Sequence, residues 1–577
     1  MTDLPNHTPL PRRWRIQPIV PRDIDVALGE FNALMRQLLY NRGLNDPVSA
    51  SDFLAGEVAY STDPFLLKDM AAAVDRLHAA IRRDEAIVVY GDYDADGVTA
   101  SALMYEFLTA LGAAPRIYIP NRFDEGYGLN EEAIRQLAGE GVDLLITVDC
   151  GARAVHEVSL AVELGMDVII TDHHAPGEHL PPAAALINPK QPGDAYPDRY
   201  LAGVGLAYKL TQAYLETYPQ VGIDPAEWLD LVAIGTVADL APLQGENRML
   251  VRDGLKRLRR RTRPGLVALA GAAGLNLANC NTGMIGFGLG PRLNAAGRID
   301  TAMTAFELLT TRDYQRAGEL AQILDDQNSQ RQDETQQIRE LAAAQVLERD
   351  PDVLLFFAAD PAFNPGVVGL AASRLAEAYY RPAIIAHQGE EFTVGSCRSI
   401  EEFHITKALD ECSHLLVRHG GHAAAAGFTA RNELVPELVL QLTAIAAREL
   451  AGVALTPVIN IDREIRLEKL NGRYISGIFN DLHQLEPTGR GNPEPVFASY
   501  DLTVRHARPV GKGNAHLKLT LQAGNALYDA IAFQQGDWFA EMPDRVDIAY
   551  RFEENNYMGR VNLQLNIKDL RPAEKSL

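Results

Sequence analysis

Three short aliphatic runs, each followed within a few residues by acidic or imidazole side chains, constrain the fold of this chain more than any other feature. The runs are residues 86–90, 144–148 and 168–171, and they lead into Asp92, Asp94 and Asp96, into Asp149, and into Asp172, His173 and His174. Helical patterns lie between the runs, which is typical of a parallel α/β sheet. Because the carboxyl ends of parallel strands share one edge of a sheet, we expect these side chains to meet at a single site.

The residue types at that edge predict a divalent metal site. Several carboxylates at close range cannot all stay ionised unless a cation neutralises them. Carboxylates combined with one or two imidazoles suit Mn²⁺ or Mg²⁺ better than metals that prefer thiolates. Two such ions about 3.5–4 Å apart form a clamp for phosphoryl transfer. A further acid, Asp239, follows an apolar helical run and is placed to complete the site.

Each of these motifs also has a purely structural interpretation when it stands alone. The acidic motif at Asp92 resembles a calcium loop, but an EF-hand needs Glu at its twelfth position, which is Leu103 here. A pair of histidines is more often part of a surface or a core, and an Asp after a strand often caps a helix. Three such motifs at three consecutive strand ends favour the metal site over these alternatives.

At these positions the chain resembles the DHH phosphoesterase superfamily. The matching segments are residues 92–97, 148–151, 172–174 and 238–242. The resemblance implies catalysis by seven residues, of which all except His174 would ligate two Mn²⁺ or Mg²⁺ ions: Asp92, Asp94, Asp96, Asp149, His173, His174 and Asp239. It places Asp149 between the two ions and gives His174 a role in orienting the site or assisting at the phosphate.

Further segments narrow the resemblance to the RecJ-like exonucleases of this superfamily. They are residues 120–128, 290–298, 420–422, 426–428 and 489–495, and the similarity extends from about residue 50 to 570. The resemblance implies a 5′→3′ exonuclease that is specific for single-stranded DNA and acts in DNA repair and recombination. The substrate-binding residues that it implies are Arg122, Arg292, Asn294, Arg298, Ser396, Arg398, Gly420, Gly421 and His422.

Three of those residues have a chemical reason to bind a strand end. Ser396 and Arg398 place a hydroxyl close to a guanidinium, a combination that fits a terminal phosphate because arginine binds phosphate oxygens bidentately. In RecJ-like proteins these two residues, together with Arg122, are expected to hold the 5′-phosphate. The alternative is that both arginines form ordinary surface ion pairs.

The length of 577 residues requires several domains, because a single core seldom exceeds about 250–300 residues. We expect an N-terminal segment (1–60), a parallel-sheet DHH domain (61–300), a long connecting helix (301–348), a smaller α/β DHHA1 domain (349–455) and a C-terminal β-barrel of the OB-fold type (456–577). Basic residues and aromatics in the last domain suit single-strand binding. Barrel cores also bury aromatics, and the alternation around Tyr550 and Phe552 is typical of a core.

Charge and cysteine content bear on partners and location. Lys and Arg number 54 and Asp and Glu 76, and the resulting net charge of −22 argues against bulk attraction to nucleic acid, although not against a local basic channel. Four cysteines without CxxC spacing predict neither a zinc site nor a redox motif and suit a reducing cytoplasm. No signal peptide or membrane span is expected. The resemblance also implies a single-strand-binding protein and a helicase as partners.

Three other functions remain open at this stage. The first is a phosphodiesterase that acts on short oligonucleotides or cyclic dinucleotides, although such relatives lack a long C-terminal barrel. The second is a non-catalytic DHH-like replication scaffold, which would be expected to have lost metal ligands. The third is a single-strand-binding module without catalysis, which would explain the barrel but not the acidic strand ends.

Overall fold

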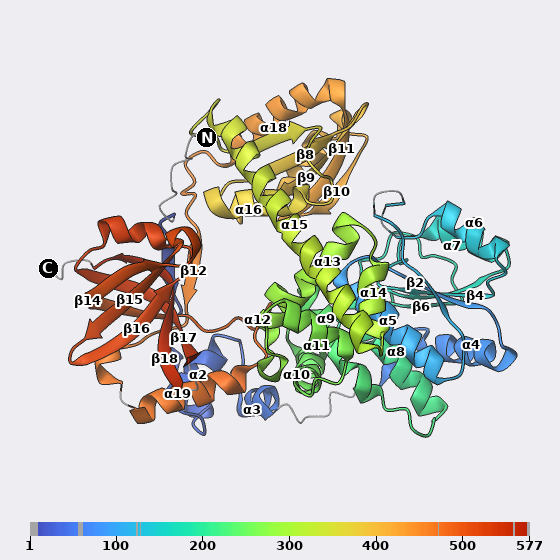
Figure 1. Cartoon of the computed structure of the whole chain (residues 1–577), viewed down its shortest axis with the longest axis horizontal. Helices are drawn as coiled ribbons and strands as arrows, with labels where there is room; N and C mark the ends of the chain where they lie inside the picture. Colours follow the sequence, from blue (N-terminus) through green and yellow to red (C-terminus); the bar gives the residue numbers. More distant parts are fainter. Residues whose placement is uncertain are drawn as a thin grey trace. The chain divides into compact units, whose positions relative to one another are not determined.

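The computed structural model of the chain describes residues 10–55, 62–122, 125–126, 128–470, 472–557 and 560–573. The chain folds into two compact units, both drawn in Figure 1. The sheet unit consists of Gly56–Asp333 and Glu486–Pro493, and the barrel unit consists of Met1–Ala55, Glu334–Leu485 and Glu494–Leu577. The described residues contain no helix that is long and apolar enough to cross a membrane.

A five-stranded parallel sheet organises the sheet unit, and its three central strands are those that the sequence predicted. The strand order is β3 (Arg116–Tyr118), β2 (Ile87–Gly91), β4 (Leu144–Val148), β5 (Asp167–Thr171) and β6 (Ala185–Ile187). The three central strands are aliphatic on both faces because helices cover both faces. Val89 and Ile146 pack into the core on one side, whereas their neighbours Val88 and Leu145 pack into the core on the other.

The order of the strands reverses direction at β2, which creates a switch point at the carboxyl edge. From β2 the chain moves to β3 on one side and then returns to β4 on the other side of β2. Ligands of open parallel sheets bind at such a switch point. Gly91 pairs with Val148, and Val148 pairs with Thr171, so the residues that follow these three strands lie in register at one edge.

Helices α6 (Glu131–Gly139) and α7 (Val155–Glu163) cover one face of the sheet, and α4 (Met70–Arg83), α5 (Ala95–Ala110) and α8 (Gly203–Thr217) cover the other (Figure 1). The unit continues with α9 (Leu229–Ala238), α10 (Gly245–Arg259), α11 (Pro264–Ala272), α12 (Thr282–Met284), a π-helical turn (Ile285–Leu289), α13 (Gly290–Ile299) and α14 (Met303–Thr310). Helix α15 (Tyr314–Leu347) begins in the sheet unit and ends in the barrel unit, because the division falls after Asp333.

A mixed five-stranded sheet forms one part of the barrel unit. Its order is β10 (Arg418–His422), β11 (Ala425–Arg431), β9 (Phe392–Arg398), β8 (Ala383–Gln388) and β7 (Phe356–Asp360). Only β7 and β8 pair in parallel, and the other pairs are antiparallel. Helices α16 (Val368–Tyr379), α17 (Ile405–Glu411) and α18 (Val435–Glu449) bury its two faces in separate cores.

A closed β-barrel forms the other part of this unit, as predicted. Strands β14 (Phe497–Val510), β15 (His516–Ala523), β16 (Ala526–Ala532), β18 (Arg560–Pro572) and β17 (Arg545–Tyr557) pair in that order, and β17 returns to β14. The short strand β13 (Arg463–Glu464) pairs with β14, and α19 (Gly472–Leu485) packs at the barrel. Tyr550 and Phe552 are core residues, as their alternation indicated.

The N-terminal segment is part of the barrel unit. Strand β1 (Arg13–Ile16) pairs in parallel with β12 (Val458–Ile461). Helices α1 (Arg22–Ala27), α2 (Ala33–Tyr40) and α3 (Pro47–Ala55) follow, and the residues from Leu28 to Leu54 bury side chains in the same core as the barrel strands. The sequence offers no local signal for this long-range packing.

Arg263 ties the helices of the sheet unit together from a buried position. Its side chain is 5% exposed and lies 2.8 Å from Glu106 and 3.0 Å from Asp230, which belong to α5 and α9. It also donates to the carbonyl of Leu309 in α14 at 2.7 Å. The carboxylates raise the pKa of Arg263 against the effect of burial, which by itself lowers it. A guanidinium in this environment stays charged, and it is the ion-pair partner of the buried Asp230, whereas Glu106 also pairs with Arg312.

We expect Arg263→Ala to destabilise the sheet unit by about 3–5 kcal/mol, because removing one member of a buried ion pair leaves uncompensated buried charge. The exposed pair of Arg316 with Glu307 provides a matched control, and Arg316→Ala should change stability little. Thermal unfolding measures the loss, and hydrogen exchange in α5 and α9 locates it. Equal stability of the two variants would contradict this role for Arg263.

Candidate metal centre

Asp92, Asp94 and Asp96 lie where β2 passes into α5. Asp94 is the N-cap of the helix, and one of its oxygens accepts from the backbone N–H groups of Asp96 at 2.8 Å and Gly97 at 3.1 Å. Asp96 is 1% exposed and points away from that cap. Its carboxylate accepts from the N–H groups of Gly203 at 2.7 Å and Val204 at 2.9 Å, at the start of α8. The positive end of α8 therefore stabilises one of the buried acids.

Two glycines let α8 and α9 approach these acids closely. A Cβ on Gly203 would lie 2.5 Å from the carboxylate oxygen of Asp149, and one on Gly235 would lie 2.7 Å from that of Asp96. Both distances are too short for any other residue, so each helix carries glycine at the contact. Asp149 itself has a φ of 63°, a left-handed conformation that turns its side chain directly after β4.

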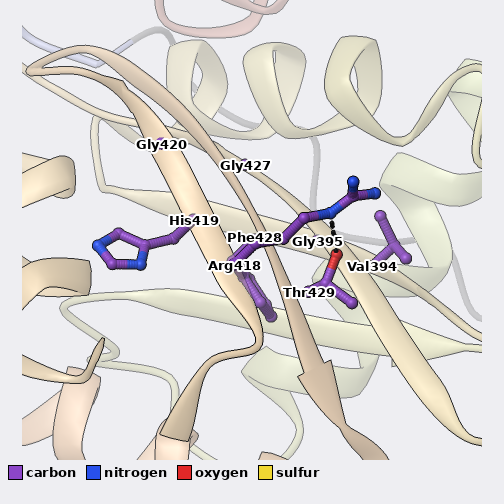
Figure 2. Close-up of a pocket in the computed structure, with 8 residues that line it drawn as sticks. All are labelled: Val394, Gly395, Arg418, His419, Gly420, Gly427, Phe428 and Thr429. Carbon is purple, nitrogen blue, oxygen red and sulfur yellow. Dashed lines mark hydrogen bonds between the residues drawn. The ribbon is translucent and has the colours of Figure 1, made fainter. Parts of the chain in front are cut away.

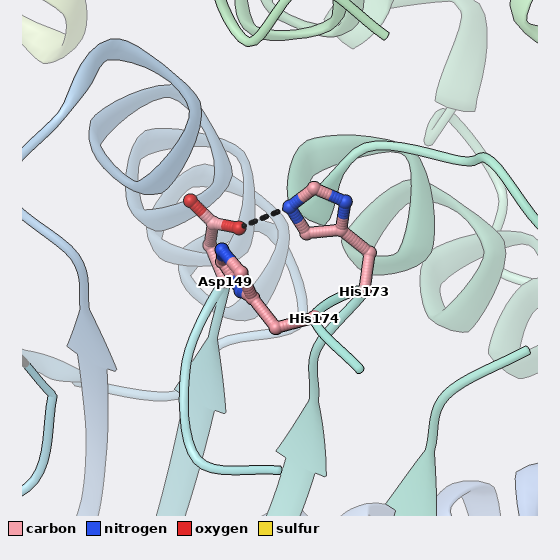
Figure 3. Close-up of side chains that lie close together, drawn as sticks. All are labelled: Asp149, His173 and His174. Atoms are coloured by element: carbon pink, nitrogen blue, oxygen red, sulfur yellow. Dashed lines mark ion pairs between the residues drawn. The ribbon is translucent and has the colours of Figure 1, made fainter. Parts of the chain in front are cut away.

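The predicted ligands converge around the imidazole of His173. Its Nε2 lies 3.1 Å from Oδ1 of Asp149, 3.9 Å from Oδ2 of Asp239 and 4.0 Å from Oδ2 of Asp96. Figure 3 shows His173 and Asp149 facing each other across the edge of the sheet, with His174 beside them. Asp92, Asp94 and Asp149 form a second close group, whose oxygens lie within 4.8 Å of one another. The sequence expectation of one shared site is confirmed in its geometry.

Three buried atoms in this site have no hydrogen-bond partner. They are Oδ1 of Asp92, Oδ1 of Asp149 and Nε2 of His173. The last two lie within ion-pair distance, but in an orientation that makes no hydrogen bond. A buried polar atom without a partner is costly, and all three carry lone pairs that suit a cation. The donor set therefore fits Mn²⁺ or Mg²⁺, which coordinate oxygen and imidazole ligands.

Burial and mutual repulsion shift the carboxylates strongly. Burial, followed by the neighbouring charge of Asp94, raises the pKa of Asp92 to about 8 and that of Asp239 to about 7. Burial and the surrounding acids also raise the pKa of Asp96 and Asp149. Without a cation, Asp92 and Asp239 therefore retain protons near neutral pH. Burial lowers the pKa of His173 to about 3, so its ring is neutral and its nitrogen can serve as a ligand.

His174 differs from His173 in charge because of Asp172. Its Nδ1 lies 2.8 Å from Oδ1 of Asp172, whose carboxylate also accepts from the N–H groups of Ala152 and His174. Burial alone would lower the pKa of His174, but the hydrogen bond and charge of Asp172 outweigh burial and raise it. The imidazole of His174 is 45% exposed. Asp172 therefore favours the protonated form of His174 beside the metal ligands.

Lys190 is a neighbour of the site that the sequence did not reveal. Its Nζ donates to the carbonyl of His173, and burial lowers its pKa. The lysine follows β6, a strand of three residues in register with β5. A short aliphatic run before Asn188 and Lys190 was the only available signal, and it was too short to identify a strand.

A cluster of arginines lies on the Asp94 side of the site. Arg122 is placed over the ring of Tyr93, with 5.1 Å from its Cζ to the ring centroid. Burial, then repulsion by Arg122 and Arg331, lowers the pKa of the partly buried Arg298 to about 10. Arg331 in α15 was not among the predicted substrate residues. Three guanidiniums that repel one another form an environment suited to a polyanion. Phe123, Asp124 and Tyr127 of the predicted segment 120–128 lie outside the described residues.

Two other predicted substrate residues make structural contacts. Arg292 forms an ion pair with Asp325 at 2.7 Å and donates to the carbonyl of Gly288. Asn294 accepts from the N–H of Ala95 at 2.7 Å, so it holds the first turn of α5 and with it the acids. These contacts give both residues a positioning task.

The remaining predicted substrate residues lie on the mixed sheet of the barrel unit. Arg398 donates to Oγ of Ser396 at 3.1 Å, and burial lowers its pKa. A Cβ on Gly369, in the first turn of α16, would lie 2.9 Å from that Oγ. The serine and the arginine thus sit at the N-terminus of a helix, where anions bind readily.

The segment Gly420 to His422 forms the edge strand of the same sheet. Gly420 pairs with Gly427, and Gly427 pairs with Ser396, so all three share one face. This face carries a shallow pocket of about 270 Å³, which Figure 2 shows with Arg418 and Thr429 beside the two glycines. Gly421 has a φ of 145° and no room for a Cβ, whereas a Cβ on Gly420 would meet open space. The backbone conformation requires glycine at position 421. At position 420, the absence of a side chain leaves room for a ligand to approach the strand.

We expect Mn²⁺ to stabilise the protein more strongly at higher pH. The raised pKa of Asp92 and Asp239 means that the metal-free protein gains stability from protonation below about pH 4 and loses it as pH rises through about 7 and 8. Metal binding needs the deprotonated acids. The increase in melting temperature on adding Mn²⁺ should therefore grow between pH 5.5 and 8.5 and be smaller in Asp92→Asn. The same increase at both pH values would contradict these shifts.

Comparisons with known proteins agree with this geometry. The model of the DHH family, N-terminal domain, matches residues 86–236, that of the DHHA1 domain matches 350–448, and that of the RecJ OB domain matches 461–569. A single-stranded-DNA-specific exonuclease RecJ of Bacillus subtilis is 41% identical, and the alignment covers 98% of this chain and 71% of that protein. The protein of the same name in Escherichia coli is 35% identical, with 94% and 96% covered.

Solved structures extend the agreement to three dimensions. The crystal structure of Thermus thermophilus RecJ in complex with Mn²⁺ matches with a TM-score of 0.82 and 32% identity, covering 97% of this chain and 80% of that one. A structure of the same protein with Mg²⁺ has a TM-score of 0.76 at 31% identity, covering 97% and 79%. Because the identity exceeds 30% over nearly the whole length, and the acids and histidines converge as a phosphoesterase site requires, the chain belongs to the RecJ family of DHH phosphoesterases.

Proposed function

We propose that this chain is a single-stranded-DNA-specific 5′→3′ exonuclease that hydrolyses phosphodiester bonds with two divalent cations and acts in DNA repair and recombination. The observation that carries the proposal is the set of unpaired buried ligand atoms around His173 at the switch point of the sheet. The RecJ relatives are named single-stranded-DNA-specific exonucleases, which supports the choice of substrate.

Two groups of residues would hold the cations. Asp96, His173 and Asp239 form one group, and Asp92, Asp94 and Asp149 form the other, with Asp149 close to both. Mn²⁺ or Mg²⁺ bound here would activate water and stabilise charge on the attacked phosphate. The protein's own contribution is position: α8 fixes Asp96, Asn294 fixes the start of α5, and the N-cap fixes Asp94.

His174 would contact the phosphate directly. Asp172 holds its imidazole through Nδ1 and favours its protonated form, so the Nε2–H on the other side of the ring is the donor that would reach a phosphate oxygen. Asp172 is thus a positioning residue. The sequence identified it only as the first residue of the motif at residues 172–174. Arg122, Arg298 and the polar α15 segment around Arg331 would bind the strand on the other side.

Ser396 and Arg398 at the N-terminus of α16 would receive the 5′-phosphate. A terminal phosphate carries more charge and more free oxygens than an internal phosphodiester. A site that combines a guanidinium, a hydroxyl and a helix N-terminus therefore selects strand ends. The pocket beside Gly420 and Arg418 extends this face and would accommodate the first nucleotide (Figure 2).

The barrel would hold the strand through its solvent-facing side. Arg508 on β14 lies directly opposite Lys518 on β15. Like charges at opposite positions of a sheet are unfavourable unless an anion bridges them. Phe533 nearby is 47% exposed and packs edge-on against His516, so its ring can stack on a base. The side chain of Tyr557, another aromatic of this region, lies outside the described residues.

The alternatives receive less support. A phosphodiesterase for dinucleotides would not need the barrel, and a scaffold would not retain every ligand. We place the enzyme in the cytoplasm, because its four cysteines are free and buried and form no disulfide among the described residues. A single-strand-binding protein and a helicase are the partners that would supply its substrate.

Asp149→Asn should abolish cleavage, with a loss of more than about 1,000-fold in kcat, because it removes a charge that both cation groups need. The folded structure should remain, since Asn tolerates the left-handed conformation at this position. Digestion of a long single strand labelled at its 5′ or 3′ end, with and without Mn²⁺, measures activity and direction. Undiminished digestion by the variant, or release of label from the 3′ end first, would refute the proposal.

Arg398→Ala should weaken the preference for 5′-phosphorylated strands over 5′-hydroxyl strands by about 10- to 100-fold in kcat/KM, the range for a charged hydrogen bond. Arg374→Ala, in the exposed face of α16, is the matched control and should leave the preference unchanged. Competition between the two substrates gives the ratio. An unchanged ratio in Arg398→Ala would exclude it as the phosphate receptor.

A further inference from the structure

The segment 486–493 comes from the C-terminal part of the sequence but folds with the sheet unit. It follows α19 and precedes β14, and both of those elements belong to the barrel unit. In the sequence, the only notable feature of this segment is its resemblance to RecJ-like proteins, and that resemblance implies no function for it. Its contacts identify one.

Hydrogen bonds to backbone atoms hold the segment on the sheet unit. Arg248, which is 3% exposed, donates to the carbonyls of Pro487 at 3.0 Å and Glu486 at 2.8 Å. The side chain of Thr282 donates to the carbonyl of Thr488 at 2.6 Å. The backbone N–H of Leu243 donates to the carbonyl of Arg490 at 2.7 Å, and the side chain of Gln244 donates to the carbonyl of Gly491 at 2.8 Å. Because every one of these acceptors is a main-chain carbonyl of the segment, these bonds do not depend on the side chain of Arg490.

The two glycines beside Arg490 make this close approach possible. A Cβ on Gly489 would lie 2.8 Å from Cδ1 of Leu243. Gly491 has a φ of 77°, and a Cβ there would lie 3.2 Å from Pro242. Asn492 is 1% exposed and donates to the carbonyl of Pro487, which closes the turn. The segment is therefore a rigid loop with Arg490 at its tip.

The side chain of Arg490 lies at the rim of the metal centre. Its Nη1 donates to the carbonyl of Leu240 at 3.3 Å, one residue after the predicted ligand Asp239. It is close enough to Asp239 to act on its charge, as His174 and Lys190 do. The residue is exposed, and the ion pairs found among the described residues do not include it. A guanidinium has more N–H donors than this one bond uses.

We propose that Arg490 binds a non-bridging oxygen of the phosphodiester at the metal centre and so acts as a substrate-binding residue in hydrolysis. The inference rests on the proposed nuclease function. Its physical basis is a guanidinium on the Asp239 side of the centre, bonded to the carbonyl of Leu240, in addition to the arginine cluster near Asp94. A donor held in place before the reaction stabilises developing phosphate charge without reorganisation.

A role in balancing the charge of Asp239 is the competing explanation. It predicts a direct bond between Arg490 and that carboxylate, whereas the guanidinium bonds to the carbonyl of Leu240. It also predicts that loss of Arg490 weakens metal binding. Phosphate binding predicts instead that metal affinity does not fall and that only reactions with DNA suffer.

The test compares Arg490→Ala, Arg490→Lys and Arg490→Gln with the wild-type chain, using Arg260→Ala on the exposed end of α10 as a matched control. We expect Arg490→Ala and Arg490→Gln to lower kcat/KM on a 5′-phosphorylated single strand by about 10- to 100-fold. Arg490→Lys should recover part of the loss. The slope of log kcat/KM against log salt should become shallower by about 0.7 for each phosphate that the protein no longer neutralises. Mn²⁺ affinity, measured by calorimetry without DNA, should not fall.

Each outcome has a distinct meaning. An inactive wild-type chain would overturn the proposed function itself. An active wild type with Arg490→Gln at more than half its kcat/KM would overturn the inference about Arg490. A loss that saturating Mn²⁺ restores would assign Arg490 to the metal site and would also overturn it. Because Arg490→Gln can keep the hydrogen bond to Leu240, its melting temperature separates a chemical loss from a folding defect.

Discussion

The crowding of buried carboxylates around one neutral imidazole is the constraint on which the rest of this structure depends. Asp96 and Asp149 are each 1% exposed, and His173 is 9% exposed. Ionised groups in such a place are costly unless they are paired or bound to metal. The protein itself stabilises Asp96 through the N-terminus of α8 and Asp94 through a helix cap. It leaves Asp92, Asp149 and His173 each with an atom that has no hydrogen-bond partner and that a cation would satisfy.

The acidic strand ends were predictable because they depend on local pattern and on one general rule of parallel sheets. A buried strand of a parallel sheet appears in the sequence as a short aliphatic run. The register of the strands then places the residue that follows each run at the carboxyl edge of the sheet. Gly91 pairs with Val148, and Val148 pairs with Thr171. The residues that follow them, Asp92, Asp149 and Asp172, are therefore neighbours at the edge of the sheet. The same logic failed at Lys190, because β6 is only three residues long. It also gave no information on Gly203 and Gly235, whose role depends on how α8 and α9 pack.

The predicted substrate residues were harder to judge from sequence, because an arginine can serve a ligand or another side chain equally well. Arg292 is paired with Asp325, 33 positions later, and no local pattern reveals this pair. Asn294 supports Ala95 across 199 positions. Arg398 and Ser396, in contrast, lie two residues apart on one strand and therefore share a face, which sequence spacing does encode. The family resemblance implied that all of these residues bind substrate. Only the structure shows which of them make supporting contacts within the protein and which have donors available for a ligand.

The division of the chain into units follows packing and not sequence order. The N-terminal helices join the core of the barrel more than 400 positions away, and residues 486–493 leave the barrel unit for the sheet unit. Such exchanges are invisible to periodicity, since both segments look like ordinary connections. Their effect on the site is nevertheless direct. A loop that is held through its carbonyls and contains two glycines can carry a single side chain to a defined place, and beside Asp239 it adds the guanidinium of Arg490 to the side chains of His174 and Lys190, which follow strands of the sheet.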